Sequence, residues 1–477
     1  MAGDNLNGEN PNMLHIVMFP WLAYGHMMPY LRVSIQLAEM GHRISFLSTP
    51  KNVRSLQSHV PLHVSHLINF FELPLPSVDG LPASAESTAE IRNNQVPYLK
   101  KAYDLLQPSV TEFLQNSNRV DWIIQDVVSH WMPEVAFRLK IDLAMFIIFS
   151  ATTMAFFGPL SMLINGTRVT KHEDLTVTPQ WMDYPTSVRF HLHELVSHDV
   201  CMDSNLSDWD RFAKAIQGSK FVAMRSCREF ELDAIRVLER IYDIPAIPLG
   251  LLHPKALAKH AGGAKDGGGD DQKWLKLKNW LDTKEEKTVM YVAFGSEVIL
   301  KPAAMHDLAT GIEKSGAHFV WVLRDRDMLP TDYEARVSGR GFIWSGWAPQ
   351  VDVLSHPSVG GFLTHCGWSS VVEALGLGRA LVLFSGGSSD MGLVARQVHE
   401  RRLGLEVPRN EGDGSFTVDG VSDTIRRVMI DDEGAEIRAN AWAAREVICS
   451  ADVQDRCIHE LNRALVDLGT VGPNRDA

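Results

Sequence analysis

Cysteine is scarce in this sequence, with 5 residues in a chain of 477. No two of them have the spacing of a zinc knuckle or a redox motif, and the number is odd. So few thiols fit a reducing compartment, where they act as small buried apolar groups. The N-terminal segment is polar and lacks the basic-then-apolar pattern of a signal peptide. We therefore expect a cytoplasmic protein.

An excess of positive charge is also missing. The chain has 46 lysine and arginine residues against 58 aspartate and glutamate residues, a net charge of -12 at pH 7. This balance argues against a nucleic-acid partner but is compatible with local basic pockets for an anionic ligand. The apolar share of 45% is that of a globular protein, and the length suggests two or three domains of about 150 residues.

Long apolar runs are nearly absent. Only residues 143–164 form an uncharged stretch that is long enough to cross a bilayer. Its first residues are all apolar, whereas its later part contains Gly158 and Pro159. LAMFIIF is typical of a buried parallel strand, and MAFFGPLSML of a packed helix. We therefore expect a strand and a helix here, and no transmembrane segment.

Several motifs of nucleotide binding and hydrolysis are missing. No GxGxxG fingerprint follows the first expected strand, and the absence of any Gly-Lys dipeptide excludes a Walker A loop. There is no GxSxG elbow. The segment HELVSH (193–198) places its histidines five residues apart, whereas a zinc protease helix needs four. We expect that segment to be a solvated loop.

What is present is an alternation of strands and helices. LHIVMFP (14–20), a glycine-containing turn, an amphipathic helix, Gly41 and HRISFLST together form a βαβ unit, which indicates a parallel sheet. Another strand is expected at residues 121–125. The pattern restarts after residue 273 with TVMYVAF, and VGGFLT, HCGWSS and VVEALGLG follow as a strand, a turn and a helix.

The predicted fold class is therefore α/β, with two Rossmann-like parallel-sheet domains that face each other across a cleft. The first domain covers residues 1–252, and a flexible linker rich in glycine and aspartate covers 253–273. The second domain covers 274–455, and a C-terminal helix at 456–477 packs back on the first domain. In such folds ligands bind beyond the carboxyl ends of the strands.

His26 and Asp126 both follow expected strands. His26 lies at the start of the first helix, where the helix dipole disfavours an imidazolium and keeps the ring able to accept a proton. A carboxylate bonded to one ring nitrogen would set the tautomer for proton abstraction. From spacing alone, a surface turn residue and a helix cap are the favoured interpretation, because a histidine and an aspartate 100 residues apart occur by chance in many proteins.

Two turns of the second half could bind phosphate. Ser369 and Ser370 in THCGWSS (364–370) lie at a helix N-terminus, whose N–H groups attract anions, and His365 could donate to a phosphate oxygen. Gly295-Ser296 follows a strand in the same way. Ordinary turn and capping residues are the alternative, although two such turns in one domain favour a nucleotide ligand.

From Trp347 to Met391 the sequence reads WAPQVDVLSHPSVGGFLTHCGWSSVVEALGLGRALVLFSGGSSDM. It resembles the signature box of plant UDP-dependent glycosyltransferases (family 1, GT-B fold), because WAPQ, VLSH, VGGFLTHCGW and the later Glu373 all match. FPWLAYGHMMPYL, GHRISFLSTPKN and YVAFGSEV extend the likeness over nearly the whole chain. They resemble the branch that adds a sugar to a sugar already on a flavonoid, terpenoid or steroidal glycoside.

The resemblance implies that the first domain binds the acceptor and the second the UDP-sugar. His26 would be the general base on the acceptor hydroxyl, oriented by Asp126. Trp347 would stack on the uracil with Gln350 beside it, and Glu373 would accept from the ribose hydroxyls. The full set of implied donor-binding residues is Ser296, Trp347, Ala348, Gln350, His365, Trp368, Ser369, Ser370, Glu373, Asp390 and Met391. Helix N–H groups and His365 would stabilise the diphosphate, so neither a metal nor another cofactor is implied.

This sequence departs from the family pattern at three places. Ser369 stands where the family usually has asparagine, and a hydroxyl can still donate to phosphate. The usual proline near the end of the box is replaced by SGGSSD. The box normally closes with an acidic residue and glutamine, which hold the donor sugar, whereas this chain has Asp390-Met391. A thioether cannot donate a hydrogen bond, so one sugar hydroxyl loses its usual partner.

The predicted function is inverting transfer of a sugar from a UDP-sugar to a hydroxyl of a small lipophilic acceptor, with an existing glycoside favoured. UDP-rhamnose, UDP-glucose and UDP-xylose are all open as donors. One alternative is a UDP-glucose-dependent enzyme that acts on an aglycone. Another is a weakly active nucleotide-sugar-binding protein, which Met391 would explain but for which the His26–Asp126 pair would be superfluous. The acceptor, the linkage position and the oligomeric state follow from no spacing rule.

Overall fold

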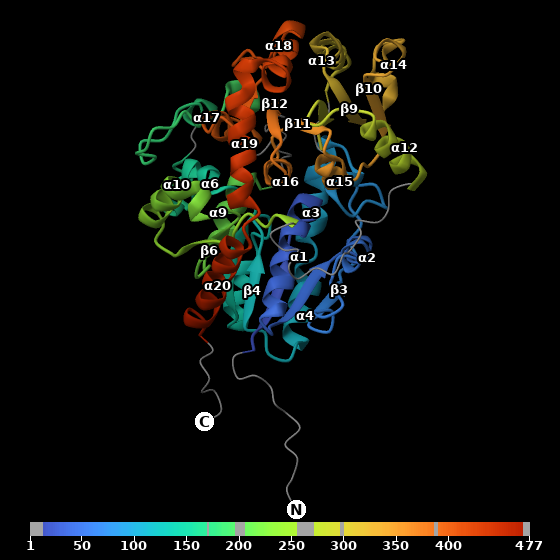
Figure 1. Ribbon diagram of the computed structural model, residues 1–477. Coiled ribbons are helices and arrows are strands. Elements are labelled where there is room, and N and C mark those ends of the chain that lie inside the picture. Colours follow the sequence, from blue (N-terminus) through green and yellow to red (C-terminus); the bar gives the residue numbers. More distant parts are fainter. Residues whose placement is uncertain are drawn as a thin grey trace, which may run out of the picture.

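Two parallel β-sheets, one in each half of the chain, form the framework of the protein (Figure 1). The computed structural model describes residues 13–168, 171–195, 206–254, 271–295, 300–385 and 390–470. The first sheet has the strand order β3-β2-β1-β4-β5-β6-β7, and the second has the order β10-β9-β8-β11-β12-β13. The described strands of both sheets pair in parallel, which confirms the predicted fold class.

The strand boundaries lie close to those expected from the apolar runs. The strands are β1 (His15–Phe19), β2 (Arg43–Ser48), β3 (Ile68–Glu72), β4 (Trp122–Gln125), β5 (Asp142–Ile147), β6 (Val222–Met224), β7 (Ala246–Pro248), β8 (Val289–Ala293), β9 (His318–Leu323), β10 (Gly341–Ser345), β11 (Val359–Thr364), β12 (Ala380–Leu383) and β13 (Gly404–Glu406). Most are short and apolar because helices cover both faces of each sheet.

The helices connect successive strands and cover the two sheets. They include α1 (Tyr24–Glu39), α2 (Pro50–Gln57), α3 (Val96–Asp104), α4 (Gln107–Asn116), α5 (Met132–Leu139), α6 (Ala151–Phe157), α7 (Leu160–Ile164), α8 (Leu192–Leu195), α9 (Asp208–Ile216), α10 (Arg228–Ile241), α12 (Asp271–Asp282), α13 (Pro302–Ser315), α14 (Tyr333–Arg336), α15 (Gln350–Ser355), α16 (Trp368–Gly376), α17 (Met391–Glu400), α18 (Val418–Met429), α19 (Ala435–Ile448) and α20 (Ala451–Asp467).

Strand β1 shows why strands of the N-terminal sheet are continuous apolar runs in the sequence. Ile16 and Met18 belong to the hydrophobic cluster on one face of the sheet, together with residues of α1. Val17 and Phe19 belong to the cluster on the other face, with residues of α3, α4 and α5. Successive side chains of a strand point to opposite faces, so a strand buried on both sides carries no polar alternation.

The apolar stretch 143–164 folds as predicted into a strand followed by helical segments. Residues 143–147 belong to β5, and α6 and α7 follow, separated by Gly158 and Pro159. Gly158 has a φ of +94°, a conformation that favours glycine and that ends α6. Among the described helices, none combines the length and the apolar character that a bilayer crossing requires.

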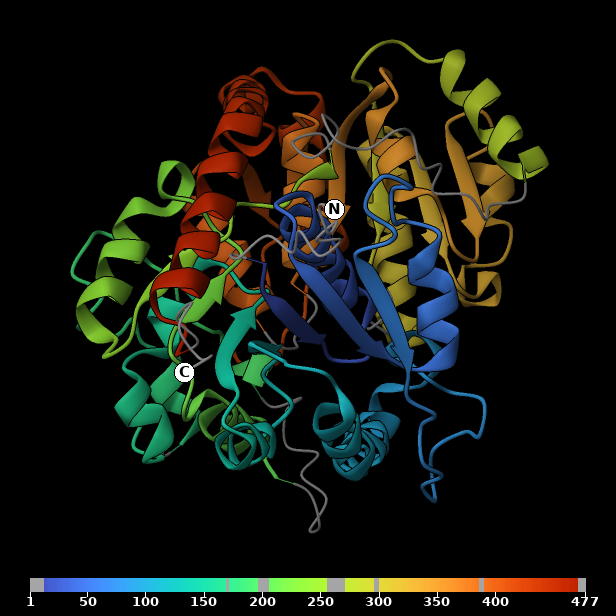
Figure 2. The ribbon, with the colours of Figure 1, turned by 90° about the horizontal axis from the view of Figure 1, so that it is seen from below.

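The chain returns to the N-terminal half at its end. Residues 255–270, most of the expected linker, lie outside the described residues. Helix α19 packs against α16 of the C-terminal half, whereas α20 packs against β7 and α1. The Trp122 indole N–H donates to the carbonyl of Leu465 at 2.9 Å. Figure 2 shows this red helix beside the green part of the N-terminal half. Helix α20, which follows α19 of the C-terminal half, thus connects that half to the N-terminal half.

Candidate functional site

His26 and Asp126 meet at the carboxyl edge of the N-terminal sheet. His26 lies in the first turn of α1, which follows β1, and Asp126 comes directly after β4. These two strands are neighbours, with Phe19 opposite Gln125. The sheet therefore brings together two residues that are 100 positions apart, and His26 Nδ1 lies 2.8 Å from Asp126 Oδ2.

The Asp126 carboxylate is completely buried and firmly held. Its Oδ2 also accepts from the Trp21 backbone N–H at 3.0 Å, and its Oδ1 accepts from the Val127 N–H at 2.7 Å. The His26 side chain is 17% exposed. A carboxylate at Nδ1 favours the tautomer that carries its proton there, so Nε2 is the ring atom able to accept a proton. The arrangement suits a general base.

His365 lies at the carboxyl end of β11, between two glycine-containing turns. A Cβ atom at Gly295 would come within 2.8 Å of its Cε1, and one at Gly367 within 2.6 Å of its Nε2. Both turns thus need glycine, because a residue with a Cβ atom could not lie this close to the His365 ring. Burial lowers the pKa of His365 to about 4. The imidazole is therefore neutral near pH 7 and acts through hydrogen bonding rather than through charge.

Several predicted donor residues gather around Glu373 on α16. Gln350, the first residue of α15, donates through Nε2 to Glu373 Oε2 at 2.9 Å and to Ser370 Oγ at 3.2 Å. Arg32 of α1 reaches Glu373 Oε1 at 3.8 Å. The Trp347 ring is 71% exposed, next to the buried Ala348. The cluster thus combines an exposed indole with a polar group that faces the other domain.

Tyr24 and Trp347 bring the N-terminus of α1 close to this cluster. Their ring centroids lie 5.7 Å apart at an interplanar angle of 75°. Because Tyr24 begins the helix that carries His26, the contact connects the His26 region with the expected uracil site. This contact therefore brings the helix that carries His26 next to Trp347 of the other domain.

The sequence analysis missed Arg225, which follows β6 in the N-terminal domain. This arginine is completely buried and donates through Nη1 to Ser369 Oγ at 2.6 Å. The Trp368 indole N–H donates to its carbonyl at 2.9 Å. A charged residue directly after the apolar segment FVAM was the signal that could have indicated it. For Arg32, which lies within an amphipathic helix, nothing in the sequence indicated a contact with the donor cluster.

The remaining predicted residues lie further along the C-terminal sheet. Asp390 and Met391 are buried where α17 begins. Met391 belongs to the hydrophobic core of the C-terminal domain. Ser296 lies outside the described residues, as do residues 386–389 of the glycine- and serine-rich segment that precedes Asp390. None of the contacts described above brings Asp390 or Met391 together with the other predicted residues.

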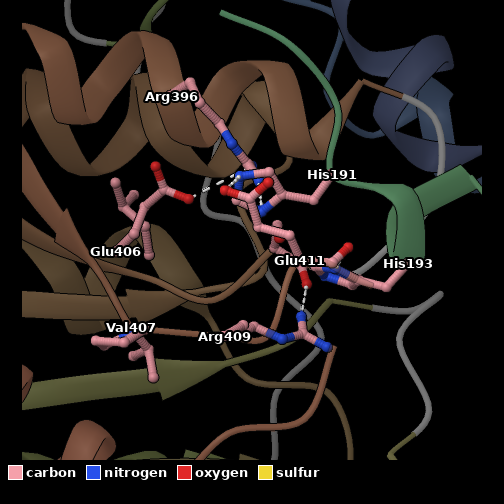
Figure 3. Close-up of a pocket in the computed structure, with 10 residues that line it drawn as sticks. His191, His193, Arg396, Glu406, Val407, Arg409 and Glu411 are labelled. Atoms are coloured by element: carbon pink, nitrogen blue, oxygen red, sulfur yellow. Dashed lines mark hydrogen bonds and ion pairs between the residues drawn. The ribbon is translucent and has the colours of Figure 1, made fainter. Parts of the chain in front are cut away.

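A polar cavity of about 200 Å³ lies beside α17 (Figure 3). Its lining includes His191 and His193 from the N-terminal domain and Arg396, Glu406 and Arg409 from the C-terminal domain. Ser385, the last described residue before 386–389, also lines it. The cavity is thus next to the segment expected to hold the donor sugar.

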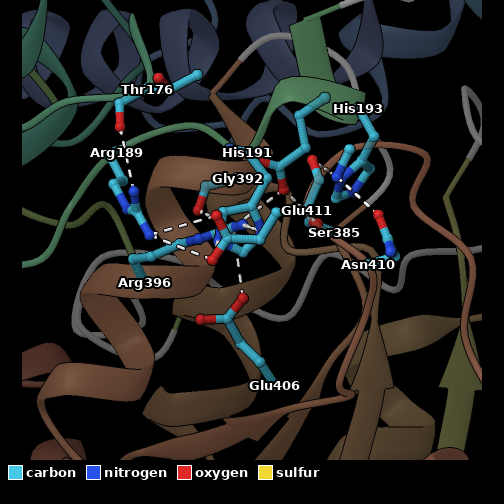
Figure 4. A network of polar contacts seen from close by, with 12 residues as sticks. Thr176, Arg189, His191, His193, Ser385, Gly392, Arg396, Glu406, Asn410 and Glu411 are labelled. Carbon is cyan, nitrogen blue, oxygen red and sulfur yellow. Dashed lines mark hydrogen bonds and ion pairs between the residues drawn. The ribbon is translucent and has the colours of Figure 1, made fainter.

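His191, Ser385 and Arg396 belong to a polar network beside this cavity (Figure 4). Glu194 also belongs to this network. It is 1% exposed, accepts from Arg396 Nη1 at 3.0 Å and accepts from Ser385 Oγ at 2.6 Å. Arg396 Nη2 lies 2.6 Å from His191 Nδ1. The expectation of a solvated loop at HELVSH is therefore wrong for residues 193–195, because α8 buries Glu194 against a cation of the other domain. Residues 196–198 lie outside the described residues.

The histidines of this network are kept neutral. Burial, and then the positive charge of Arg396, lower the pKa of His191 to about 4. Burial and then Arg409 lower the pKa of His193. Within the described residues, no cluster of three histidine, cysteine or acidic side chains is arranged to hold a metal ion. The hydrogen bonds and ion pairs of this network join residues of the two domains.

Comparison with known proteins shows the family of this chain. The sequence model of the family UDP-glucoronosyl and UDP-glucosyl transferase matches residues 85–386. UDP-glycosyltransferase 91C1 of Arabidopsis thaliana is 42% identical over 465 residues, which cover 97% of this chain and 98% of that protein. Cyanidin 3-O-galactoside 2''-O-xylosyltransferase FGGT1 of Actinidia chinensis var. chinensis is 33% identical over 471 residues, or 95% and 98% of the two chains.

The fold has close counterparts among solved structures. UGT73P12 of Glycyrrhiza uralensis, crystallised with glycyrrhetinic acid 3-O-monoglucuronide, superposes with a TM-score of 0.79 at 22% identity and covers 95% of this chain and 96% of its own. This likeness confirms the GT-B fold, and the sequence matches confirm the family resemblance. The chain belongs to the UDP-glycosyltransferase family, as a plant-type enzyme that transfers a sugar from a UDP-sugar to a small molecule.

Proposed function

We propose that this enzyme transfers a sugar, with inversion, to a sugar hydroxyl of an existing flavonoid, terpenoid or steroidal glycoside. The observation that carries the proposed transfer is the His26–Asp126 pair, because it places an imidazole, held by a buried carboxylate, at the carboxyl edge of the sheet. The acceptor would bind in the N-terminal domain and the UDP-sugar in the C-terminal domain. Closure of the cleft between them would exclude water from the reaction.

In the proposed reaction, His26 Nε2 takes the proton of the acceptor hydroxyl while its oxygen attacks the anomeric carbon. The bond from that carbon to the diphosphate oxygen breaks, and its electron pair leaves with UDP. Attack from the face opposite to the leaving group inverts the configuration. Asp126 stabilises the imidazolium that forms and keeps the ring oriented. Binding both substrates in this geometry supplies much of the rate increase.

We assign the donor to the cluster around Glu373. The exposed Trp347 ring offers a flat face to the uracil, and Gln350 lies close to the same carboxylate, which would accept from the ribose hydroxyls. The N-terminus of α16, with Trp368, Ser369, Ser370 and the neutral His365, would hold the diphosphate through N–H and O–H donors. No metal or other cofactor takes part in this proposal.

The donor sugar depends on Asp390 and Met391 in this proposal. An acidic residue can accept from two hydroxyls, but the buried thioether of Met391 cannot donate to a third. UDP-rhamnose and UDP-xylose, which lack a hydroxyl or a hydroxymethyl group of glucose, therefore fit this end of the site better than UDP-glucose. The Actinidia relative, named as a xylosyltransferase acting on a galactoside, supports both a pentose donor and a glycoside acceptor.

A screen of donors against acceptors tests this function. Purified protein is incubated with UDP-glucose, UDP-rhamnose or UDP-xylose, together with flavonoid and terpenoid glycosides or the matching aglycones, and products are identified by mass. We expect a pentose or deoxyhexose to be added to the sugar of a glycoside. Glucose on an aglycone would favour the first alternative. Binding of UDP without any transfer would favour the weakly active binding protein.

A further inference from the structure

Arg225 is a buried cation of the N-terminal domain, and its side chain contacts the C-terminal domain. Its Nε donates to the carbonyl of Leu251 at 2.8 Å, and its Nη1 donates to Ser369 Oγ at 2.6 Å. Its Nη2 is buried and has no hydrogen-bond partner among the described residues. The side chain is completely buried, where an unpaired N–H group is costly. The N–H groups of Nη2 thus remain for a ligand.

No protein carboxylate neutralises this guanidinium at ion-pair distance within the described part of the chain. Burial, and then the positive charge of Arg32, lower the pKa of Arg225 to about 9, and the nearby Glu373 opposes this shift. The group is therefore still cationic near pH 7. A buried charge is costly unless it is paired. Since Glu373 is already engaged by Gln350 and Arg32, an anion from outside the chain is the fitting partner.

The end of α16 next to Arg225 attracts such an anion. This helix has nine residues, and its N-cap, Gly367, provides no side-chain cap for the first N–H groups. Free N–H groups and the helix dipole favour negative charge there. Neutral His365 adds no charge at this end. Arg225 therefore complements the helix N-terminus with the positive charge that Ser369 and Ser370 cannot supply.

We propose that Arg225 is a specificity-determining contact for the diphosphate, supplied by the N-terminal domain. Its Nη2 donates to a diphosphate oxygen of the UDP-sugar bound at α16, while its Nη1 positions Ser369. The inference rests on the proposed donor site and deepens it. Because the leaving UDP gains a negative charge as the sugar departs, the contact strengthens during the reaction. Binding of the diphosphate also connects the two domains directly.

Calorimetric titration with UDP and with uridine tests this contact. Arg225→Gln keeps a polar side chain but removes the charge, so its affinity for UDP should fall about 10- to 100-fold. Uridine lacks the diphosphate, so its affinity should stay within about 2-fold of the wild-type value. Arg225→Lys keeps the charge without the planar fork and should recover part of the UDP affinity. Equal losses for UDP and uridine, or no loss for UDP, would overturn the proposal.

Arg379→Gln is the matched control. Arg379 is also buried and donates through Nε to the carbonyl of Leu354 at 2.7 Å, within the C-terminal domain alone. This variant loses a buried guanidinium without losing a contact at α16, so its affinities for UDP and uridine should remain those of the wild type. A weaker affinity for UDP alone in this variant would show that the effect is not particular to Arg225.

A crystal structure of the wild-type chain with UDP decides the question if Arg225 variants do not fold. We expect a diphosphate oxygen within about 3.2 Å of Arg225 Nη2, and a separation beyond about 5 Å would overturn the inference. Failure of the proposed function gives a different result. The wild-type protein would then bind UDP without transferring a sugar, or bind neither UDP nor uridine, whereas failure of the inference alone leaves binding and transfer intact.

Discussion

Asp126 shows how one residue can determine the chemistry of another. Its two oxygens accept from the backbone N–H groups of Trp21 and Val127 and from His26 Nδ1. The carboxylate therefore cannot turn away from the imidazole without leaving buried N–H groups unpaired. The orientation and tautomer of His26 follow from this network, and so does the choice of Nε2 as the base.

Replacement of His26 by alanine should reduce kcat by about 10²- to 10⁴-fold, because the acceptor hydroxyl loses its base. Affinity for UDP should be unchanged, since the donor cluster lies in the other domain. Steady-state kinetics and UDP titration measure the two effects. Asp126→Asn should also lower kcat while UDP binding is kept. Unchanged turnover of His26→Ala would remove the assignment of the base.

Met391→Gln tests the donor preference at the level of a single side chain. Glutamine restores a donor for a sugar hydroxyl, so the ratio of kcat/KM for UDP-glucose to that for UDP-xylose should rise about 10-fold. Met391→Leu, which also lacks a donor, should leave the ratio as in the wild type. If the glutamine variant keeps the wild-type ratio, residues other than 391 determine the donor.

At the scale of secondary-structure elements, the segment 186–195 fastens the N-terminal domain to α17. Thr186 Oγ1 donates to Glu400 at 3.0 Å, and Arg189 reaches Glu411 at 3.2 Å. Further along, Glu194 pairs with Arg396. All three contacts join the segment to α17 or to the loop after β13. This element therefore helps to hold α17 against the N-terminal domain.

Glu194→Gln should destabilise the protein, because among the described residues it leaves the buried Arg396 with Glu406 at 3.4 Å as its acidic partner. Removing one member of a buried pair costs about 3 kcal/mol or more, so we expect the Tm to fall by about 5 °C or more. Thermal unfolding measures this. Glu436→Gln removes an exposed partner of Arg402 and should leave the Tm unchanged. Equal Tm values for both variants would contradict a structural role for Glu194.

At the scale of the whole molecule, buried neutral histidines make stability depend on pH. His365 has a pKa of about 4 in the folded protein against 6.5 in an unfolded chain, because burial opposes its charge. Between these values the unfolded state binds a proton that the folded state does not. Stability is therefore fully present above pH 6.5 and is lost as the pH falls toward 4, by about 1.4 kcal/mol per pH unit.

Measurements of Tm at decreasing pH test this dependence. His365→Asn removes the group and should show a shallower loss of Tm between pH 6.5 and pH 4 than the wild type. His63→Asn, at a side chain that is 51% exposed, should follow the wild type. A wild-type slope in His365→Asn would mean that other groups cause the acid sensitivity.

Activity should not depend on a metal ion. In the proposed reaction the leaving diphosphate is stabilised by N–H groups of α16 and by Arg225, so treatment with EDTA should leave kcat and KM unchanged. An assay after chelation and buffer exchange measures this. Loss of activity that Mg²⁺ or Mn²⁺ restores would contradict the proposed stabilisation of the diphosphate.

The sequence by itself determined the local structure and the order of the elements. The apolar strands β1, β4 and β11 and the turns after them follow from periodicity and glycine positions, and parallel pairing follows from their alternation with helices. Parallel pairing alone places His26 and Asp126 at one edge. The resemblance of the box from Trp347 to Met391 to the family signature then implied that Trp347, Gln350 and Glu373 act at one donor site.

Only the tertiary structure decided which residues meet across the domain boundary. Arg225 reaches Ser369 over 144 positions, and Glu194 reaches Arg396 over 202. In sequence each is a single charged residue, which indicates solvent exposure more often than burial. Contacts of this kind depend on how two folded domains pack against each other. Neither the periodicity nor the local spacing of residues in the sequence indicates that packing. The burial of these charges, and the use of Arg225 toward a diphosphate, therefore follow from the fold alone.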